Sequence, residues 1–186
     1  MDPARTQAQP TLTTARLVLR PLVAGDATVI RALAGVYEVA GTTVNIPHPY
    51  PEGAAEAFIA AQARLWHEDG GATWAIALAG DDDDTLIGCI GAVGFSRKHA
   101  RCRLGYWIAH GCWNRGYATE AAGRVVEFAF ADGIYRVEAD HLSRNPASGR
   151  VMQKIGMRHE GRLRAFYRRF DRFEDVELYA RLRDDR

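Results

Sequence analysis

The segment Trp113–Glu120 constrains the fold most, because it joins a strand-like run to a long amphipathic run. The strand-like run, residues 100–109, alternates apolar and polar side chains, as a half-buried strand does. Arg115, Gly116 and Ala118 therefore stand where a strand ends and a helix begins. Small residues at such a junction leave backbone N–H groups uncovered, and the helix dipole adds partial positive charge. The segment predicts a cradle for a phosphate-bearing ligand such as a pyrophosphate.

The length and charge of the chain narrow the class of protein. At 186 residues we expect one domain over residues 12–184, after a flexible segment 1–11. A formal net charge of +1 gives no global field that would recruit nucleic acid or an anionic membrane, and no apolar run is long enough to span one. Cys89, Cys102 and Cys112 lack metal-ligand spacing, so the sequence predicts no metal site and a reduced, cytoplasmic protein.

The order of predicted elements is that of one α/β domain around a mixed sheet. Asp26 is predicted to cap a short helix, and residues 81–84 read as a charged turn. Further helices are expected over residues 52–68 and 145–155, and one more follows the Trp113–Glu120 segment to about residue 131. Strands are expected over residues 16–22, 73–79, 85–95, 100–109, 135–140, 157–167 and 173–182.

Five segments match, in order, the motifs of a known family. They are Thr14–Arg20, Gly105–Ile108, Trp113–Ala121, Asn145–Ser148 and Lys154–Gly161. With these motifs the chain resembles the GNAT superfamily of N-acetyltransferases, and within it the RimJ/RimL-like group that acetylates protein N-termini. Trp113 stands where the wider superfamily has Gln or Arg, a change typical of this group, so its side chain is not expected to bind phosphate.

The resemblance covers nearly the whole chain and implies both the fold and the acetyl donor. The implied fold is a mixed, mostly antiparallel sheet of about seven strands, splayed between strands 4 and 5 and flanked by about four helices. The implied donor is acetyl-coenzyme A, whose pantetheine arm would lie between the splayed strands. The residues that the resemblance assigns to the donor are Trp107, Ile108, Ala109, His110, Arg115, Gly116, Tyr117, Ala118, Thr119, Asn145 and Ser148.

Transfer of an acetyl group to an amine requires a neutral nucleophile, a polarised thioester carbonyl and a proton for the departing thiolate. A tyrosine often supplies that proton in this family, but none lies between Tyr135 and Tyr167. Ser148 is therefore the candidate proton donor. The alternative is that Asn145 and Ser148 only cap the start of the helix.

Glu160 is the candidate base, because it matches a glutamate of ribosomal N-terminal acetyltransferases. The alternative is that Glu160 only shapes the bend at residues 157–161. His110 and His141 end two strands and could also serve as bases, although exposed strand ends carry such residues without function. Glu120 lies one turn into the phosphate-binding helix, and we expect it to tie that helix to a neighbouring strand.

The loop Val44–Tyr50, the helix after it and the hairpin near Arg164–Phe170 are expected to build the acceptor side. By resemblance, the expected acceptor is a protein N-terminal α-amine, such as that of a ribosomal protein. A small-molecule amine remains open, because related folds act on many acceptors. A third reading is an acyl-coenzyme A-binding domain without turnover. The sequence is compatible with a monomer or a homodimer.

Overall fold

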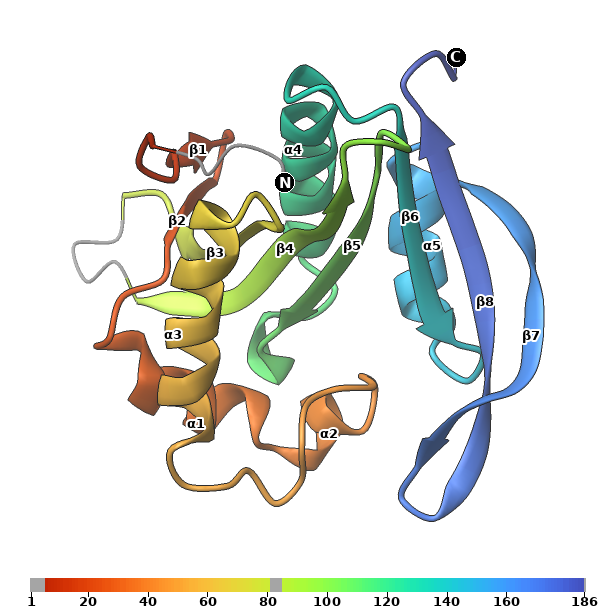
Figure 1. The fold of residues 1–186 in the computed structure, drawn as a ribbon. Helices are drawn as coiled ribbons and strands as arrows, with labels where there is room; N and C mark the ends of the chain where they lie inside the picture. The colour runs from red at the N-terminus through yellow and green to blue at the C-terminus, as the bar shows by residue number, and fades with distance from the viewer. Residues whose placement is uncertain (1–5, 81–84, 186) are drawn as a thin grey trace.

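The computed structural model describes residues 6–80 and 85–185, which form one eight-stranded sheet with helices on both faces (Figure 1). The expected turn at residues 81–84 lies outside the described residues. The strands are β1 (Leu12–Thr13), β2 (Leu17–Pro21), β3 (Gly71–Leu78), β4 (Leu86–Ser96), β5 (Arg101–Ile108), β6 (Arg136–Leu142), β7 (Arg158–Arg169) and β8 (Arg172–Leu182). The helices are α1 (Asp26–Ala34), α2 (Tyr37–Ala40), α3 (Ala54–His67), α4 (Tyr117–Ala131) and α5 (Pro146–Lys154), with a 3-10 turn at His110–Cys112.

The sheet has the order β1-β2-β3-β4-β5-β6-β8-β7. Within the described chain, β5 and β6 run parallel and the other neighbouring strands run antiparallel. This confirms the predicted α/β class with a mixed, mostly antiparallel sheet. The two-residue β1 and the four-residue α2 were not predicted, because neither is long enough to show a periodic pattern.

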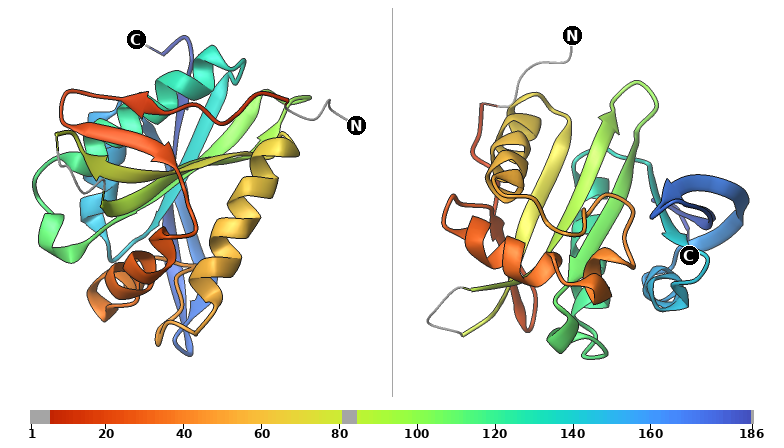
Figure 2. Two further views of the ribbon diagram at one scale, coloured as in Figure 1. Left: turned by 90° about the vertical axis from the view of Figure 1, so that its left-hand side faces the viewer. Right: turned by 90° about the horizontal axis from the view of Figure 1, so that it is seen from below.

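The two faces of the sheet carry separate apolar clusters. α4 and α5 cover one face, where Val125, Val137 and Met152 are buried together. α1 and α3 cover the other face, where Ile30 and Ile59 pack with strand residues. Figure 2 shows these helices from the side and from below. Because side chains alternate along a strand, neighbouring residues of β5 and β6 face opposite sets of helices.

β5 and β6 pair only at one end. The paired residues are Arg101–Arg103 on β5 and Arg136–Glu138 on β6, and beyond them the two strands diverge (Figure 1). The expected splay between strands 4 and 5 is therefore found between β5 and β6, since the short β1 shifts the count by one.

Two indole groups hold the chain that precedes β1. Trp66 Nε1 donates to the carbonyl of Gln7 at 2.7 Å, and Trp74 Nε1 donates to the carbonyl of Pro10 at 2.8 Å. Both indoles are buried, so each N–H needs an acceptor inside the protein. Residues 7–10 therefore lie against α3 and β3.

Within the described segments, no helix has both the length and the apolar character needed to cross a lipid bilayer.

The predicted N-cap role of Asp26 is wrong. Gly25 occupies the N-cap, and Asp26 is the first residue of α1. Its buried carboxylate forms a bidentate pair with Arg20, at 2.8 and 2.9 Å, and accepts the N–H of Val23 at 2.8 Å. A buried charge is stable only with such partners, so the guanidinium fixes the position of the carboxylate.

This pair predicts a difference between two acidic residues. We expect Asp26→Ala to lower the free energy of unfolding by about 3 kcal/mol, because Arg20 loses its buried counter-charge. The control is Asp184→Ala, whose carboxylate is 71% exposed in its pair with Arg183 and should contribute less than about 0.5 kcal/mol. Urea denaturation measures both, and equal losses would show that burial does not govern the Arg20–Asp26 pair.

Candidate active site

A cavity of about 1030 Å³ lies where β5 and β6 diverge. It is lined from both faces of the sheet. Tyr106 and Ser148 line it on the side of α4 and α5, whereas Phe58 and Trp107 line it on the side of α1 and α3. The cavity therefore passes between the two strands and connects the two faces.

The start of α4 forms one end of this cavity. Gly116 is its N-cap residue, with φ of +81°, and makes no side-chain capping bond. Within the part of the chain that the structure describes, the N–H groups of Tyr117, Ala118 and Thr119 have no hydrogen-bond acceptor. These uncapped donors, together with the helix dipole, fit an anionic group such as a pyrophosphate.

Glu120 and Arg16 hold this helix start in place. The Glu120 carboxylate accepts the Thr14 hydroxyl at 2.6 Å and the Arg16 N–H and Nε at 2.9 and 2.8 Å. Arg16 Nη1 also donates to the carbonyl of Arg115 at 3.0 Å. Burial opposes the charge of Glu120, but the bonds from Thr14 and Arg16 lower its pKa below the usual value. The expected structural role of Glu120 is confirmed.

The backbone of β5 presents alternate residues to the cavity. The N–H of Ala109 donates to the carbonyl of Ile87 at 2.8 Å, so Ala109 and Trp107 direct their backbone groups toward β4. Tyr106 and Ile108 therefore direct theirs away from β4, toward the gap. The carbonyl of Ile108 accepts Trp113 Nε1 at 2.7 Å, which leaves its N–H directed at the cavity.

The residues assigned to the donor separate into two groups. Ala109, His110 and Arg115 lie outside the cavity lining. The ring of His110 packs edge to face against the ring of Trp113, and the two ring centroids are 4.8 Å apart. The others line the cavity: Trp107, Ile108, Gly116, Tyr117, Ala118, Thr119, Asn145 and Ser148.

Ser148 is hydrogen-bonded to a tyrosine on the facing strand. The Tyr106 hydroxyl lies 2.8 Å from Ser148 Oγ and donates to the Ser148 carbonyl at 3.1 Å. Burial raises the pKa of Tyr106 to about 12, against a smaller lowering by Ser148, so the phenol stays protonated at neutral pH. The sequence did not predict Tyr106, because the family's tyrosine is expected after β6 and because Tyr106 occupies an alternate position of β5, as a core residue does.

Asn145 makes both a cap and a contact across the site. Its Oδ1 accepts the N–H of Ser148 at 3.4 Å, so it is the N-cap of α5. Its Nδ2 donates to the carbonyl of Thr42 at 3.3 Å. The amide therefore joins α5 to the loop that follows α2 while it lines the cavity.

Arginine side chains hold that same loop over the far side of the cavity. Arg144 donates to the carbonyl of Gly41, and Arg169 of β7 donates to the carbonyls of Ala40 and Ile46. The predicted acceptor loop does line the cavity, through the residues Val44, Asn45, Ile46, Pro47 and Tyr50. Tyr167 is the lining residue from the β7–β8 hairpin.

Glu160 lies outside the cavity lining. It is on β7, which pairs with β8 at the edge of the sheet, and its carboxylate is bound by Arg136, with Nη1 at 2.9 Å and Nη2 at 2.5 Å. The hydrogen bonds from Arg136 lower the pKa of Glu160, so its carboxylate is a weaker base than usual. Asp140, which the sequence analysis did not single out, lines the cavity instead.

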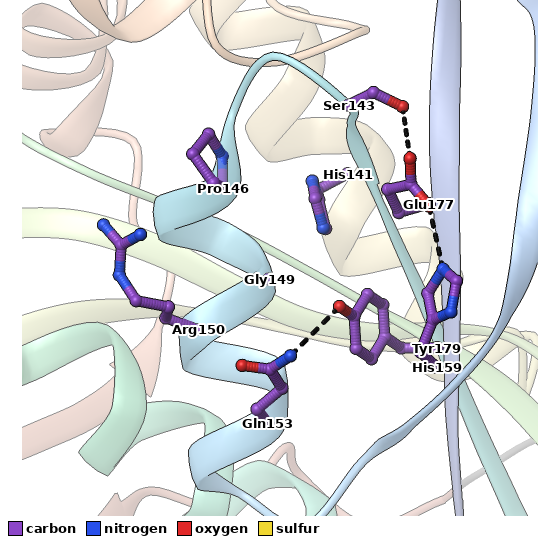
Figure 3. Close-up of a pocket in the computed structure, with 9 residues that line it drawn as sticks. All are labelled: His141, Ser143, Pro146, Gly149, Arg150, Gln153, His159, Glu177 and Tyr179. Carbon is purple, nitrogen blue, oxygen red and sulfur yellow. Dashed lines mark hydrogen bonds and ion pairs between the residues drawn. The ribbon is translucent and has the colours of Figure 1, made fainter.

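A second, smaller cavity of about 450 Å³ lies between α5 and the strands β7 and β8 (Figure 3). Glu177 accepts both the Ser143 hydroxyl at 2.7 Å and His159 Nε2 at 2.8 Å, so these groups satisfy one another. His141 separates the two cavities. Its Nδ1 bonds the Leu142 carbonyl at 2.9 Å, and its buried Nε2 has no partner among the described residues.

Within the described ranges, no group of three or more His, Cys, Asp or Glu side chains is arranged to bind a metal ion. The polar groups that line the main cavity include the uncapped N–H donors of α4, the hydroxyls of Tyr106 and Ser148 and the amide of Asn145, and these are suited to phosphate and amide groups.

Solved structures of known acetyltransferases share this fold. RimL ribosomal alpha-N-protein acetyltransferase in complex with coenzyme A has a TM-score of 0.84 at 15% identity, covering 95% of this chain and 100% of that one. Spermidine N-acetyltransferase from Vibrio cholerae, in complex with coenzyme A and spermine, has a TM-score of 0.78 at 18% identity and covers 92% and 98%.

Sequence comparison gives the family. The uncharacterized N-acetyltransferase YoaA of Bacillus subtilis is 33% identical over 172 residues, which cover 92% of this chain and 96% of that protein. The model of the acetyltransferase (GNAT) domain matches residues 16–158. The chain therefore belongs to the GNAT family of N-acetyltransferases, which use acetyl-coenzyme A as the acetyl donor.

Proposed function

We propose that this N-acetyltransferase acetylates the N-terminal α-amine of a polypeptide. The observation that carries the proposal is one continuous cavity between β5 and β6, with uncapped N–H groups at one face and an apolar mouth at the other. A donor and an acceptor that enter from opposite faces would meet between the strands.

The free thiols of all three cysteines support a reducing, cytoplasmic location for this reaction.

The donor side has groups for each part of acetyl-coenzyme A. The donor supplies an acetyl group that is activated as a thioester. The N–H groups of Tyr117, Ala118 and Thr119 would bind its pyrophosphate. The Ile108 N–H and the Asn145 amide would orient its pantetheine arm, and Arg150 and Lys154 of α5, which also line the cavity, add positive charge.

Ser148 and Tyr106 would supply the proton that the departing sulfur needs. When the Tyr106 hydroxyl donates to Ser148 Oγ, the serine proton is free to point into the cavity and to pass to the sulfur. When Tyr106 donates to the Ser148 carbonyl instead, Ser148 donates to the phenol oxygen and its proton is withheld. The bond from the acceptor nitrogen to the acetyl carbon forms as the carbon–sulfur bond breaks. The nitrogen releases its protons to water, and Ser148 regains from water the proton that it gave to the sulfur.

The surface beyond the acceptor mouth supports a polypeptide acceptor. The β7–β8 hairpin extends past the rest of the sheet (Figure 1) and exposes Phe166 by 49% and Phe173 by 70%. Exposed aromatic side chains provide a surface over which a chain could continue after its first residue enters the cavity. A small amine would leave this surface unused.

Release of free coenzyme A, measured by thiol titration, tests the function. We expect a peptide with a free α-amine to accelerate thiol release, and the same peptide with a blocked N-terminus and an internal lysine to have no effect. Acceleration by small amines alone would contradict the polypeptide acceptor. Tight coenzyme A binding without acceleration by any amine would contradict turnover itself.

The start of α4 predicts a loss of donor binding in Gly116→Val. A valine side chain would cover the donors there, so we expect coenzyme A affinity to fall at least about tenfold, measured by calorimetry. The control is Gly133→Val, because Gly133 has a similar φ of +89° and no atom within 4 Å of an added Cβ. Equal affinity in the two variants would contradict the assigned pyrophosphate position.

The hydroxyl pair predicts a loss of turnover in Ser148→Ala. We expect kcat to fall by about a hundredfold, with a smaller change in KM for acetyl-coenzyme A. Tyr106→Phe should lower kcat by about tenfold, because Ser148 keeps its own proton but loses the neighbouring donor. Steady-state kinetics measures kcat and KM for both variants. A change in KM with unchanged kcat in Ser148→Ala would show that Ser148 only caps the helix.

A further inference from the structure

One carboxylate faces the main cavity. Of the described residues that line it, Asp140 is the acidic one. Its side chain is 11% exposed, so the carboxylate is largely removed from water. An amine acceptor is a cation at neutral pH, and it needs a counter-charge when it enters a partly buried site.

Asp140 lies on the acceptor side of the sheet. Ala139 and His141, its neighbours on β6, are buried, and Ala139 belongs to the cluster beneath α4 and α5. Because strand residues alternate, Asp140 faces the side of α1 and α3. It stands two residues beyond Glu138, the last residue of β6 that pairs with β5. The carboxylate therefore lies where the two strands begin to part.

Arg103 holds one oxygen of the Asp140 carboxylate and leaves the other oxygen able to accept a hydrogen bond. Arg103 Nη2 donates to Asp140 Oδ1, and Asp140 and Tyr167 raise the pKa of Arg103 against the effect of its burial. Within the described chain, Oδ2 of Asp140 has no hydrogen-bond partner. A carboxylate accepts several hydrogen bonds, so Oδ2 can accept an ammonium group while Oδ1 stays bound to Arg103.

An apolar wall faces the same part of the cavity. Ile46, Tyr50, Phe58 and Trp107 are half-buried, line the cavity and pack against the cluster of α1 and α3. Such a wall favours an apolar group of the acceptor, because contact with the wall removes that group from water. A second ammonium group would find Arg103 there and no further carboxylate among the described lining residues.

We propose that Asp140 Oδ2 binds the ammonium group of the acceptor, and that the acceptor is an α-amine next to an apolar side chain. This inference rests on the proposed function and adds to it the residue that recognises the amine and the kind of N-terminal residue. It disfavours a polyamine, which carries several ammonium groups and no apolar side chain.

Calorimetry on the protein saturated with coenzyme A tests the proposal. The probes are phenylalaninamide, which carries the ammonium group, and 3-phenylpropanamide, which has the same body without it. We expect Asp140→Asn to weaken phenylalaninamide binding by about tenfold to a hundredfold and to leave binding of 3-phenylpropanamide and coenzyme A unchanged. Asp140→Glu should restore most of the phenylalaninamide affinity, because it keeps the charge.

The matched control is Glu138→Gln, which removes one negative charge from the same strand outside the cavity lining. We expect it to leave the binding of both amides unchanged. Equal weakening of both amides by Asp140→Asn, or no weakening of either, would overturn the proposal and leave Asp140 as a link between the strands. Tighter binding of spermidine than of phenylalaninamide would overturn the apolar acceptor. Failure of the unaltered protein to bind coenzyme A would overturn the proposed function instead.

Discussion

The early end of pairing between β5 and β6 is the constraint on which the site depends. After Arg103 and Glu138 the two strands share no ladder, so backbone groups in the middle of a sheet lack their usual partners. Buried backbone donors and acceptors require hydrogen bonds, and an extended ligand with amide groups can supply them. The separation of the two strands thus provides space for a ligand and leaves backbone groups that need hydrogen bonds from it.

Side chains on each face keep this separation in a defined geometry. Tyr106 reaches from β5 to Ser148 at the start of α5, and Arg103 reaches from β5 to Asp140 on β6. Both links cross the gap, one on each face of the sheet. These links keep the groups that line the cavity in fixed positions relative to one another although the strands diverge. Acyl transfer requires groups that are preorganised in this way.

Local patterns made part of the fold and site predictable. The α/β class, the mixed sheet and the start of α4 follow from alternation, from amphipathic spacing and from the glycine before Tyr117, which are all features of contiguous residues. Asn145 and Ser148 were predicted from the family resemblance, and their assigned roles stay predictions. The position of the splay also came from the family resemblance and not from periodicity.

The remaining site residues depend on contacts that no local pattern encodes. Tyr106 and Asp140 lie on separate strands that each look like ordinary half-buried strands, and only the diverging geometry of β5 and β6 brings them to one cavity. Asp26 was misassigned because Arg20 is a stronger partner than the helix end. Glu160 stays a predicted base, although its ion pair with Arg136 holds it outside the cavity lining.

Amide hydrogen exchange with and without coenzyme A tests most directly the claim that the donor occupies the gap between β5 and β6. With coenzyme A bound, we expect slower exchange at Tyr117, Ala118 and Thr119, whose N–H groups have no acceptor in the described chain, and at Ile108, whose N–H faces the gap. Amides of the second cavity, between α5 and β8, should be unaffected. Protection at that second cavity, with unchanged exchange at Ile108 and at the start of α4, would contradict the account.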